Sequence, residues 1–225
     1  MKEKGLVENA LLFLPAKYRR YSFALTSLEK FGITKKQIVF LRRKSNIKVK
    51  EATFATTAEW HPAALHKIRE ILLQAPKKTN LDLGKKIYIS REKQVLRFVE
   101  NEKEVVALLE KYGFKKIITE TLSYEEQISI CSNAEYLVSP HGAGLTNLLF
   151  MPKNSSVLEL TVDLTRFRPF LTEYHRLSSM LDIRYFNQAC EMGPNSTLKD
   201  SHQASLVVDL TKLEKNLQLM LKNDR

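Results

Sequence analysis

A short glycine-containing turn joins two apolar runs of the chain, and it constrains the fold more than any other segment. Its sequence is Val138-Ser139-Pro140-His141-Gly142-Ala143-Gly144-Leu145-Thr146-Asn147. The run at 135–138 predicts a buried strand, and the apolar spacing of 145–151 predicts a helix. Glycine lets a backbone approach a ligand closely, and the first N–H groups of a helix lack intrahelical partners. The pattern therefore predicts a phosphate site, most simply for the diphosphate of a nucleotide, with His141 as an added polar group.

Strands and helices alternate regularly from residue 86 onward. Apolar runs predict strands at 86–90, 114–118, 135–138, 156–160 and 183–186. Helical spacing predicts helices at 102–112, 124–132, 143–150, 169–180 and 210–222, with Ser123 and Glu126 as a capping box. Strands joined by crossover helices form a parallel sheet covered on both faces. We therefore expect an α/β fold with a Rossmann-like sheet, and an exposed loop at 191–204.

The first third of the chain has a less regular pattern. Helices are predicted at 21–31 and 61–74, with Pro62 in the first turn of the second helix. Strands are predicted at 37–41 and 47–50, and a linker at 76–80. We therefore expect two parts, a partial N-terminal region with its linker at 1–80 and a Rossmann-like domain at 81–225.

The net charge is concentrated in the first of these parts. Residues 1–80 contain 17 Lys and Arg against 6 Asp and Glu, whereas residues 81–225 contain 19 of each. The whole formal charge of +11 thus belongs to 1–80. Such an excess indicates an anionic partner, which is a membrane surface, a nucleic acid or an acidic polymer. A solvated basic face, or a face that meets an acidic surface, explains the charge equally well.

Ligands of such sheets bind beyond the carboxyl ends of the strands, and several polar residues are predicted there. Arg91 directly follows the strand at 86–90, with Arg97 in the same loop, and a guanidinium binds phosphate oxygens bidentately. The alternative is that both are ordinary surface arginines. Glu159 lies within an apolar strand and needs a partner there. A ribose diol is one candidate, and an edge position facing water is the alternative.

Several other site types lack their sequence signature. The turn has Gly142 and Gly144 without the third glycine of a dinucleotide fingerprint, and neither a P-loop nor a downstream Gly-x-Ser-x-Gly occurs. No Asp-x-Asp or Cys-His cluster is present, so we expect no metal site. Cys131 and Cys190 lack C-x-x-C spacing, which indicates reduced thiols of a cytosolic protein. We expect neither a membrane-spanning segment nor a signal peptide, because the apolar run at 10–14 is interrupted by Pro15.

A set of motifs occurs in a fixed order between residues 81 and 165. They are Lys86-Ile87-Tyr88-Ile89-Ser90-Arg91 with Arg97, Asn101-Glu102, Tyr112-Gly113-Phe114, Leu122-Ser123-Tyr124-Glu125-Glu126-Gln127, the turn at 139–147 with Phe150, and Val157-Leu158-Glu159-Leu160. Each motif alone is weak, but the ordered set is specific. It resembles the family 61 glycosyltransferases, including the bacterial capsular-polysaccharide type, with a weaker likeness over 28–54.

This resemblance implies a GT-B fold and an inverting transfer from a nucleotide-sugar donor, without an essential metal ion or other cofactor. Residues 81–225 would be the donor half, and 1–80 an incomplete acceptor-side half. A glycan or a lipid-linked saccharide would be the acceptor, in surface polysaccharide synthesis. The chain would be cytoplasmic, with its basic part at the inner face of an anionic membrane. His141 would be catalytic, and the donor would be bound by Arg91, Arg97, Gly142, Ala143, Gly144, Leu145, Asn147 and Glu159.

Two other classes of function remain open at this point. The chain could be a catalytically incomplete nucleotide-binding module or scaffold derived from such a transferase. Binding of nucleic acid by the basic first third ranks last, because no recognition motif or aromatic stacking pattern accompanies the charge.

Overall fold

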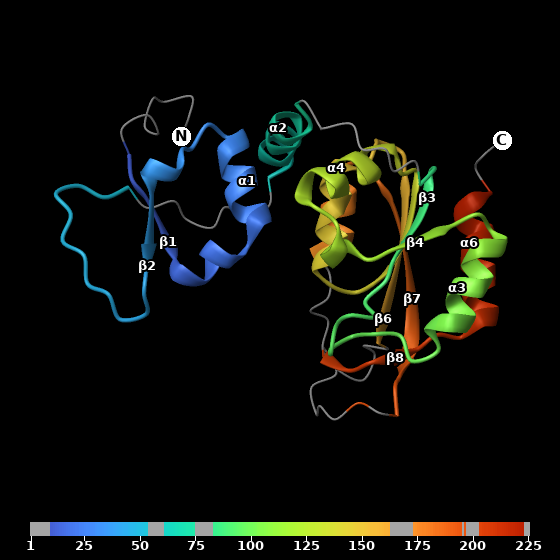
Figure 1. Ribbon diagram of the computed structural model, residues 1–225. Coiled ribbons are helices and arrows are strands. Elements are labelled where there is room, and N and C mark those ends of the chain that lie inside the picture. Colours follow the sequence, from blue (N-terminus) through green and yellow to red (C-terminus); the bar gives the residue numbers. More distant parts are fainter. Residues whose placement is uncertain are drawn as a thin grey trace. The chain divides into compact units, whose positions relative to one another are not determined.

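The computed structural model describes residues 10–53, 61–74, 83–162, 173–194, 196 and 203–222. The chain divides into two compact units, Met1–Ala75 and Pro76–Arg225, which Figure 1 draws in blue to teal and in green to red. The linker predicted at 76–80 lies outside the described residues.

The first unit contains a strand–helix–strand arrangement. Strands β1 (Leu12–Pro15) and β2 (Ile38–Leu41) pair in parallel, with Leu12 opposite Ile38. Between them lie the 3₁₀ helix η2 (Ala16–Arg20), helix α1 (Ser22–Lys30) and the short η3 (Lys35–Gln37). Helix α2 (Pro62–Leu73) begins at a proline in its first turn, as predicted.

The prediction of a strand at 47–50 is wrong. These residues form no strand, and Ile47 and Val49 are each 44% exposed. Alternation of apolar residues with lysines makes a strand only where a neighbouring strand supplies hydrogen bonds and a face to pack on. The alternation of Ile47 and Val49 with lysines therefore did not suffice to form a strand.

The second unit is built on a six-stranded sheet in the order β4-β3-β5-β6-β7-β8. The first five strands run in parallel, and β8 is antiparallel to β7. Their bounds are β3 Lys86–Ile89, β4 Lys115–Ile117, β5 Tyr136–Pro140, β6 Ser156–Val162, β7 Arg184–Met192 and β8 Leu206–Val207. The Rossmann-like α/β sheet is thus confirmed. The sequence analysis missed β8, which follows the predicted loop at 191–204, and the second half of β7, whose last two residues, 191–192, lie in that loop.

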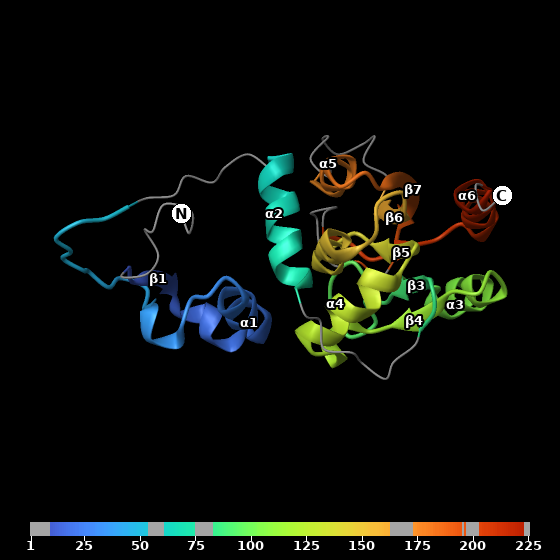
Figure 2. The same ribbon diagram turned by 90° about the horizontal axis from the view of Figure 1, so that it is seen from above.

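Helices cover both faces of this sheet, as Figure 2 shows. Helices α3 (Glu102–Lys111) and α6 (Leu210–Leu221) lie on one face. On the other face lie α4 (Tyr124–Asn133), the 3₁₀ helix η5 (Ala143–Phe150) and α5 (Glu173–Met180). The capping box of Ser123 and Glu126 starts α4 as predicted, with Glu126 N–H 3.2 Å from Ser123 Oγ. The segment predicted as a regular helix at 143–150 is a 3₁₀ helix.

The two faces of the sheet differ in polarity near the carboxyl ends of the central strands. Leu158, Leu160 and Val162 of β6 belong to the apolar core beneath α3 and α6. Because side chains alternate along a strand, Glu159 and Thr161 lie on the opposite face, which α5 covers. Glu159 is nevertheless fully buried. A buried acid on a strand of this kind needs polar partners, and these define the candidate site.

Candidate functional site

The chain reverses its direction of strand addition between β3 and β5. From β3 it proceeds to β4 on one side, and then returns to add β5 on the other side of β3. Ligands of open α/β sheets bind in the crevice that such a switch creates at the carboxyl ends of the two strands. The residues that follow these strands are Ser90-Arg91 and His141-Gly142. The sequence had predicted this sheet edge as the ligand site.

Arg91 lies against the backbone of Gly142. A Cβ atom at position 142 would overlap the guanidinium, with Cζ of Arg91 2.9 Å away. Gly142 also has φ +158° and ψ −179°, a backbone conformation that residues with a side chain rarely adopt. The Nε and Nη2 atoms of Arg91 donate to the carbonyl of Leu96 at 3.3 and 3.2 Å. The guanidinium is therefore fixed on one side by its own loop and on the other by the glycine turn.

Arg97 lies in the same loop in a less common backbone state. Its φ is +59°, in the left-handed region, and its Nε is buried without a hydrogen-bond partner among the described residues. Burial lowers the pKa of Arg91, the positive charge of Arg97 lowers it further, and Glu120 opposes this shift. Within the described ranges neither arginine forms an ion pair with a carboxylate. Two neighbouring guanidinium groups in this state favour an anion beside them.

The start of η5 adds backbone donors to this edge. Its first intrahelical bond runs from Leu145 N–H to the Gly142 carbonyl at 2.9 Å, so the N–H groups of Ala143 and Gly144 precede the first bond. Gly144 has a packing role as well, because a Cβ there would lie 3.0 Å from Cγ2 of Ile89. The side chain of Leu145 is buried in the core, so its backbone alone borders the turn.

Asn147 holds the turn rather than facing outward. Its Nδ2 donates to the carbonyl of Gly144 at 3.1 Å and to Oε1 of Gln127 at 3.2 Å. The side chain is 6% exposed. These contacts favour a role for Asn147 in fixing the turn over the donor contact that the resemblance implies.

His141 and Glu159 form a buried pair. Nδ1 of His141 lies 2.5 Å from Oε1 of Glu159, and Tyr185 donates to Oε2 at 2.5 Å. Glu159 has no exposed surface, and His141 is 9% exposed. An ionised carboxylate only accepts hydrogen bonds, so this geometry assigns a hydrogen to Nδ1. The Nε2 atom of His141 is then the ring nitrogen available to a ligand.

The pair is extended by groups that sequence reasoning missed. Asn187 donates to the hydroxyl of Tyr185 at 3.3 Å and to Oγ1 of Thr161 at 3.1 Å. Burial raises the pKa of Tyr185 far above its ordinary value, and the adjacent Glu159 carboxylate raises it further. Tyr174 of α5 meets the imidazole of His141 edge to face, at 5.3 Å between ring centroids. Tyr185 and Asn187 come from β7 and Tyr174 comes from α5, and no local motif marks them.

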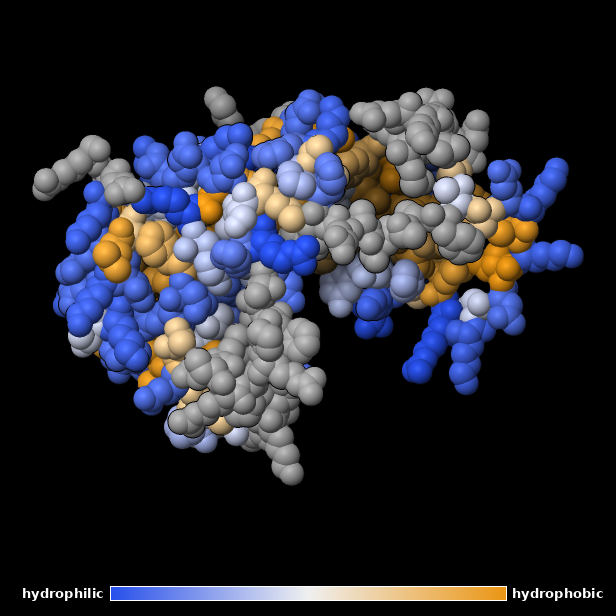
Figure 3. Space-filling view, turned by 180° about the vertical axis from the view of Figure 1, so that it is seen from behind, coloured by the Kyte–Doolittle hydropathy of each residue, from blue (hydrophilic) through white to orange (hydrophobic). Residues whose placement is uncertain are grey.

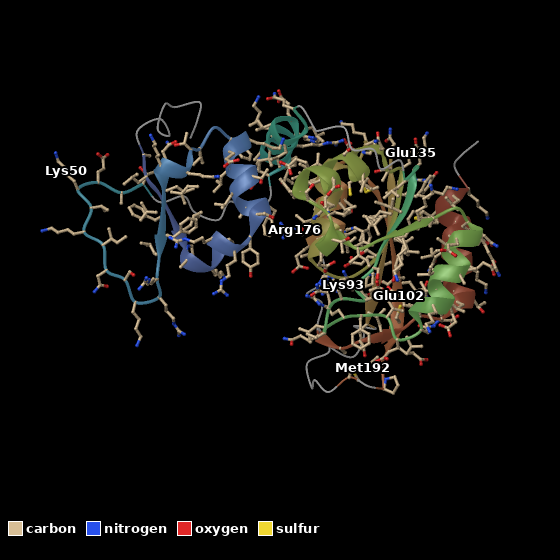
Figure 4. All side chains as sticks on the ribbon, viewed as in Figure 1. Lys50, Lys93, Glu102, Glu135, Arg176 and Met192 are labelled. Atoms are coloured by element: carbon tan, nitrogen blue, oxygen red, sulfur yellow. The ribbon has the colours of Figure 1, made fainter. Side chains whose placement is uncertain are left out.

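A second carboxylate lies on the other face of the sheet, and its contacts hold neighbouring elements of the fold together. Glu102, labelled at the start of α3 in Figure 4, accepts from Tyr88 and Ser90 at 2.8 Å each and pairs with Lys116 at 3.3 Å. Ser90 is 1% exposed. This network ties β3 to α3 and β4, and it holds Ser90 away from the ligand edge.

The described residues include no group of three or more His, Cys, Asp or Glu side chains that could hold a metal ion. Cys131 and Cys190 are both free and buried, as expected for reduced thiols. Among the helices in the described ranges, none is long and apolar enough to cross a membrane.

The fold defines a doubly wound α/β domain, with Arg91 and the glycine turn at its strand switch point. The sequence model of the family described as Glycosyltransferase 61 matches residues 8–158, and the chain belongs to this family. The resemblance inferred from the motifs is thereby confirmed.

Curated relatives match shorter parts of the chain. The EGF domain-specific O-linked N-acetylglucosamine transferase of Drosophila melanogaster is 38% identical over 91 residues, which is 39% of this chain and 17% of that protein. The human protein O-linked-mannose beta-1,4-N-acetylglucosaminyltransferase 2 is 30% identical over 100 residues, 42% of this chain and 17% of that protein. Its Xenopus laevis counterpart is 40% identical over 67 residues, which is 28% of this chain and 12% of that protein. Each match thus spans less than a fifth of the relative.

Proposed function

We propose that this chain binds a nucleotide-sugar donor and transfers its sugar, with inversion, to a glycan or lipid-linked acceptor. Membership of the glycosyltransferase family supports the reaction class, and the relatives carry the names of sugar transferases. The observation that carries the proposal is the packing of Arg91 on Gly142 at the switch point, with Arg97 beside it. This arrangement suits the diphosphate of a nucleotide.

The proposed chemistry is a direct displacement at the anomeric carbon of the donor sugar. The oxygen of the acceptor hydroxyl forms the new bond and gives its proton to water, while the bond to the diphosphate breaks and the diphosphate leaves with the electron pair. Its developing charge is stabilised by the guanidinium groups of Arg91 and Arg97 and by the N–H groups of Ala143 and Gly144. These groups supply the positive charge for which other enzymes use a bound cation, so we propose a metal-independent reaction without an added cofactor.

His141 acts on the same leaving group in this proposal. To donate to a phosphate oxygen, Nε2 must carry a hydrogen, so the acting form is the imidazolium. The carboxylate of Glu159 balances that charge and fixes the ring through Nδ1. We therefore assign Glu159 to positioning His141. Its burial and its two protein partners disfavour the ribose contact considered from the sequence.

The acceptor side and the location of the protein belong to the proposal as well. The family resemblance supports a GT-B arrangement in which residues 1–80 contribute to the acceptor side. Their excess of positive charge supports a cytoplasmic protein at the inner face of an anionic membrane, with a surface polysaccharide as product.

The test is turnover of nucleotide sugars by the purified full chain in the presence of EDTA. The UDP-, GDP-, CDP- and ADP-sugars are incubated singly, and release of the nucleoside diphosphate is measured with and without saccharide acceptors. We expect release with one nucleotide class, and about 10²-fold slower release for His141→Ala, the loss typical of one transition-state donor. Lack of release with every donor, or release that needs manganese or magnesium, contradicts the proposal.

A further inference from the structure

A pocket of about 240 Å³ lies in the first unit. Its lining residues are Ala16, Arg19, Arg20, Phe40 and Arg42. Ala16 directly follows β1, and Arg42 directly follows β2, the parallel neighbour of β1. The pocket therefore lies at the carboxyl ends of two parallel strands, the edge at which α/β sheets bind ligands.

The pocket is strongly basic, and its charges are not neutralised within the described part of the chain. Three of the lining residues are arginines, and the guanidinium of Arg19 lies over the ring of Phe40, 4.9 Å from its centroid. Residues 10–53 contain 11 Lys and Arg but only two acids, Glu29 and Glu51. Glu29 pairs with Lys35, and none of the pocket arginines forms an ion pair within the described ranges. In Figure 3, hydrophilic side chains also project from this unit.

We propose that this pocket binds a phosphate group. Three guanidinium forks offer more donors than the two oxygens of a carboxylate can accept, whereas a phosphate presents three terminal oxygens. Stacking on Phe40 holds the planar group of Arg19 in place, which reduces the entropy lost on binding. The pocket lies in the first unit and the Arg91 site in the second, so this function goes beyond donor binding. The phosphate belongs to a soluble phosphorylated saccharide or to a lipid headgroup.

The experiment maps protection of arginines in the full chain by inorganic pyrophosphate at 0.15 M salt. Phenylglyoxal modifies exposed arginines, and peptide mass spectrometry reads each site separately. We expect pyrophosphate to protect Arg19, Arg20 and Arg42 more than the adjacent exposed Arg43. In the double variant Arg19→Gln/Arg42→Gln, protection of Arg20 should need about tenfold more pyrophosphate, since two charged donors are lost.

The matched control is Lys48→Gln/Lys50→Gln, which removes the same charge from the exposed loop after β2. Figure 4 labels Lys50 on that loop. This control should leave protection of Arg20 within about twofold, because exposed charges at a distance are screened. Equal protection of Arg20 and Arg43, or equal losses in the two variants, overturns the proposal. Peptides with Arg91 and Arg97 report the donor site separately in the same digest.

Vesicles of phosphatidylglycerol and phosphatidylcholine distinguish the two sources of the phosphate. A larger loss of vesicle binding in the pocket variant than in the lysine control assigns the phosphate to a lipid headgroup. Equal losses of vesicle binding, together with the expected protection by pyrophosphate, assign it to a soluble phosphate ester.

Discussion

Glu159 lies 2.5 Å from Nδ1 of His141, although it belongs to a central strand and has no exposed surface. Its second oxygen accepts from Tyr185. Removing His141 or Tyr185 would leave the buried carboxylate of Glu159 with one partner fewer, which would lower the stability of the folded state. The carboxylate is thus committed to protein groups, and its effect on a ligand must pass through the imidazole.

Glu159→Gln tests this positioning role. Glutamine keeps the shape and can still accept from Nδ1, but it no longer balances an imidazolium. We expect turnover to fall by about 10²-fold, the usual range for a general acid–base group, and its dependence on pH to change. The readouts are kcat, KM and the pH profile. Most of the loss should appear in kcat.

Glu102→Gln is the matched control, because Glu102 also accepts from a tyrosine hydroxyl but does not contact His141. It should lower thermal stability and leave the pH profile of turnover unchanged. If the two variants have the same pH profile as the wild type, Glu159 is structural only.

The two glycines of the turn should respond differently to alanine. At position 142 a methyl group displaces Arg91, so Gly142→Ala should weaken nucleoside diphosphate binding by about tenfold, the loss of one charge-assisted contact. At position 144 it presses on Ile89, so Gly144→Ala should lower the free energy of unfolding by about 1–3 kcal/mol. Calorimetric titration and urea unfolding measure the two effects. A Gly142→Ala protein that binds as tightly as the wild type contradicts the placement of Arg91.

The burial of Cys131 leads us to predict that the folded state loses stability at alkaline pH. Burial raises the pKa of Cys131 from 9.0 to about 12. The folded state therefore retains a proton that the unfolded chain releases, and the free energy of unfolding falls as the pH rises from about 9 toward 12. Urea unfolding between pH 8 and pH 11 measures this slope, which Cys131→Ala should reduce. Below pH 9, thiol reagents should modify Cys131 only as fast as the protein unfolds.

Local patterns predicted β3, β4, β5 and β6 well, because each lies in a short apolar run between helices, whereas β7 was predicted only at its start. The turn at 138–147 and the capping box at Ser123 carry their signals within a few residues. Tyr174, Tyr185 and Asn187 could not be found in this way, since they reach His141 and Glu159 only through packing of α5 and pairing of β6 with β7. The strand predicted from alternating apolar residues and lysines at 47–50 was wrong for the same reason, because pairing with a neighbouring strand decides whether such a segment forms a strand.

The central claim is that Arg91, held on Gly142, binds the diphosphate of a nucleotide. The most direct measurement is calorimetric titration of the full chain with nucleoside diphosphates in EDTA, comparing Arg91→Gln with Lys93→Gln. Lys93 is exposed in the same loop, so the control removes the same charge. We predict binding without metal that weakens about tenfold or more in Arg91→Gln and stays within about twofold in Lys93→Gln. Equal affinities in the two variants, or binding that disappears with EDTA and returns with magnesium, would contradict the claim.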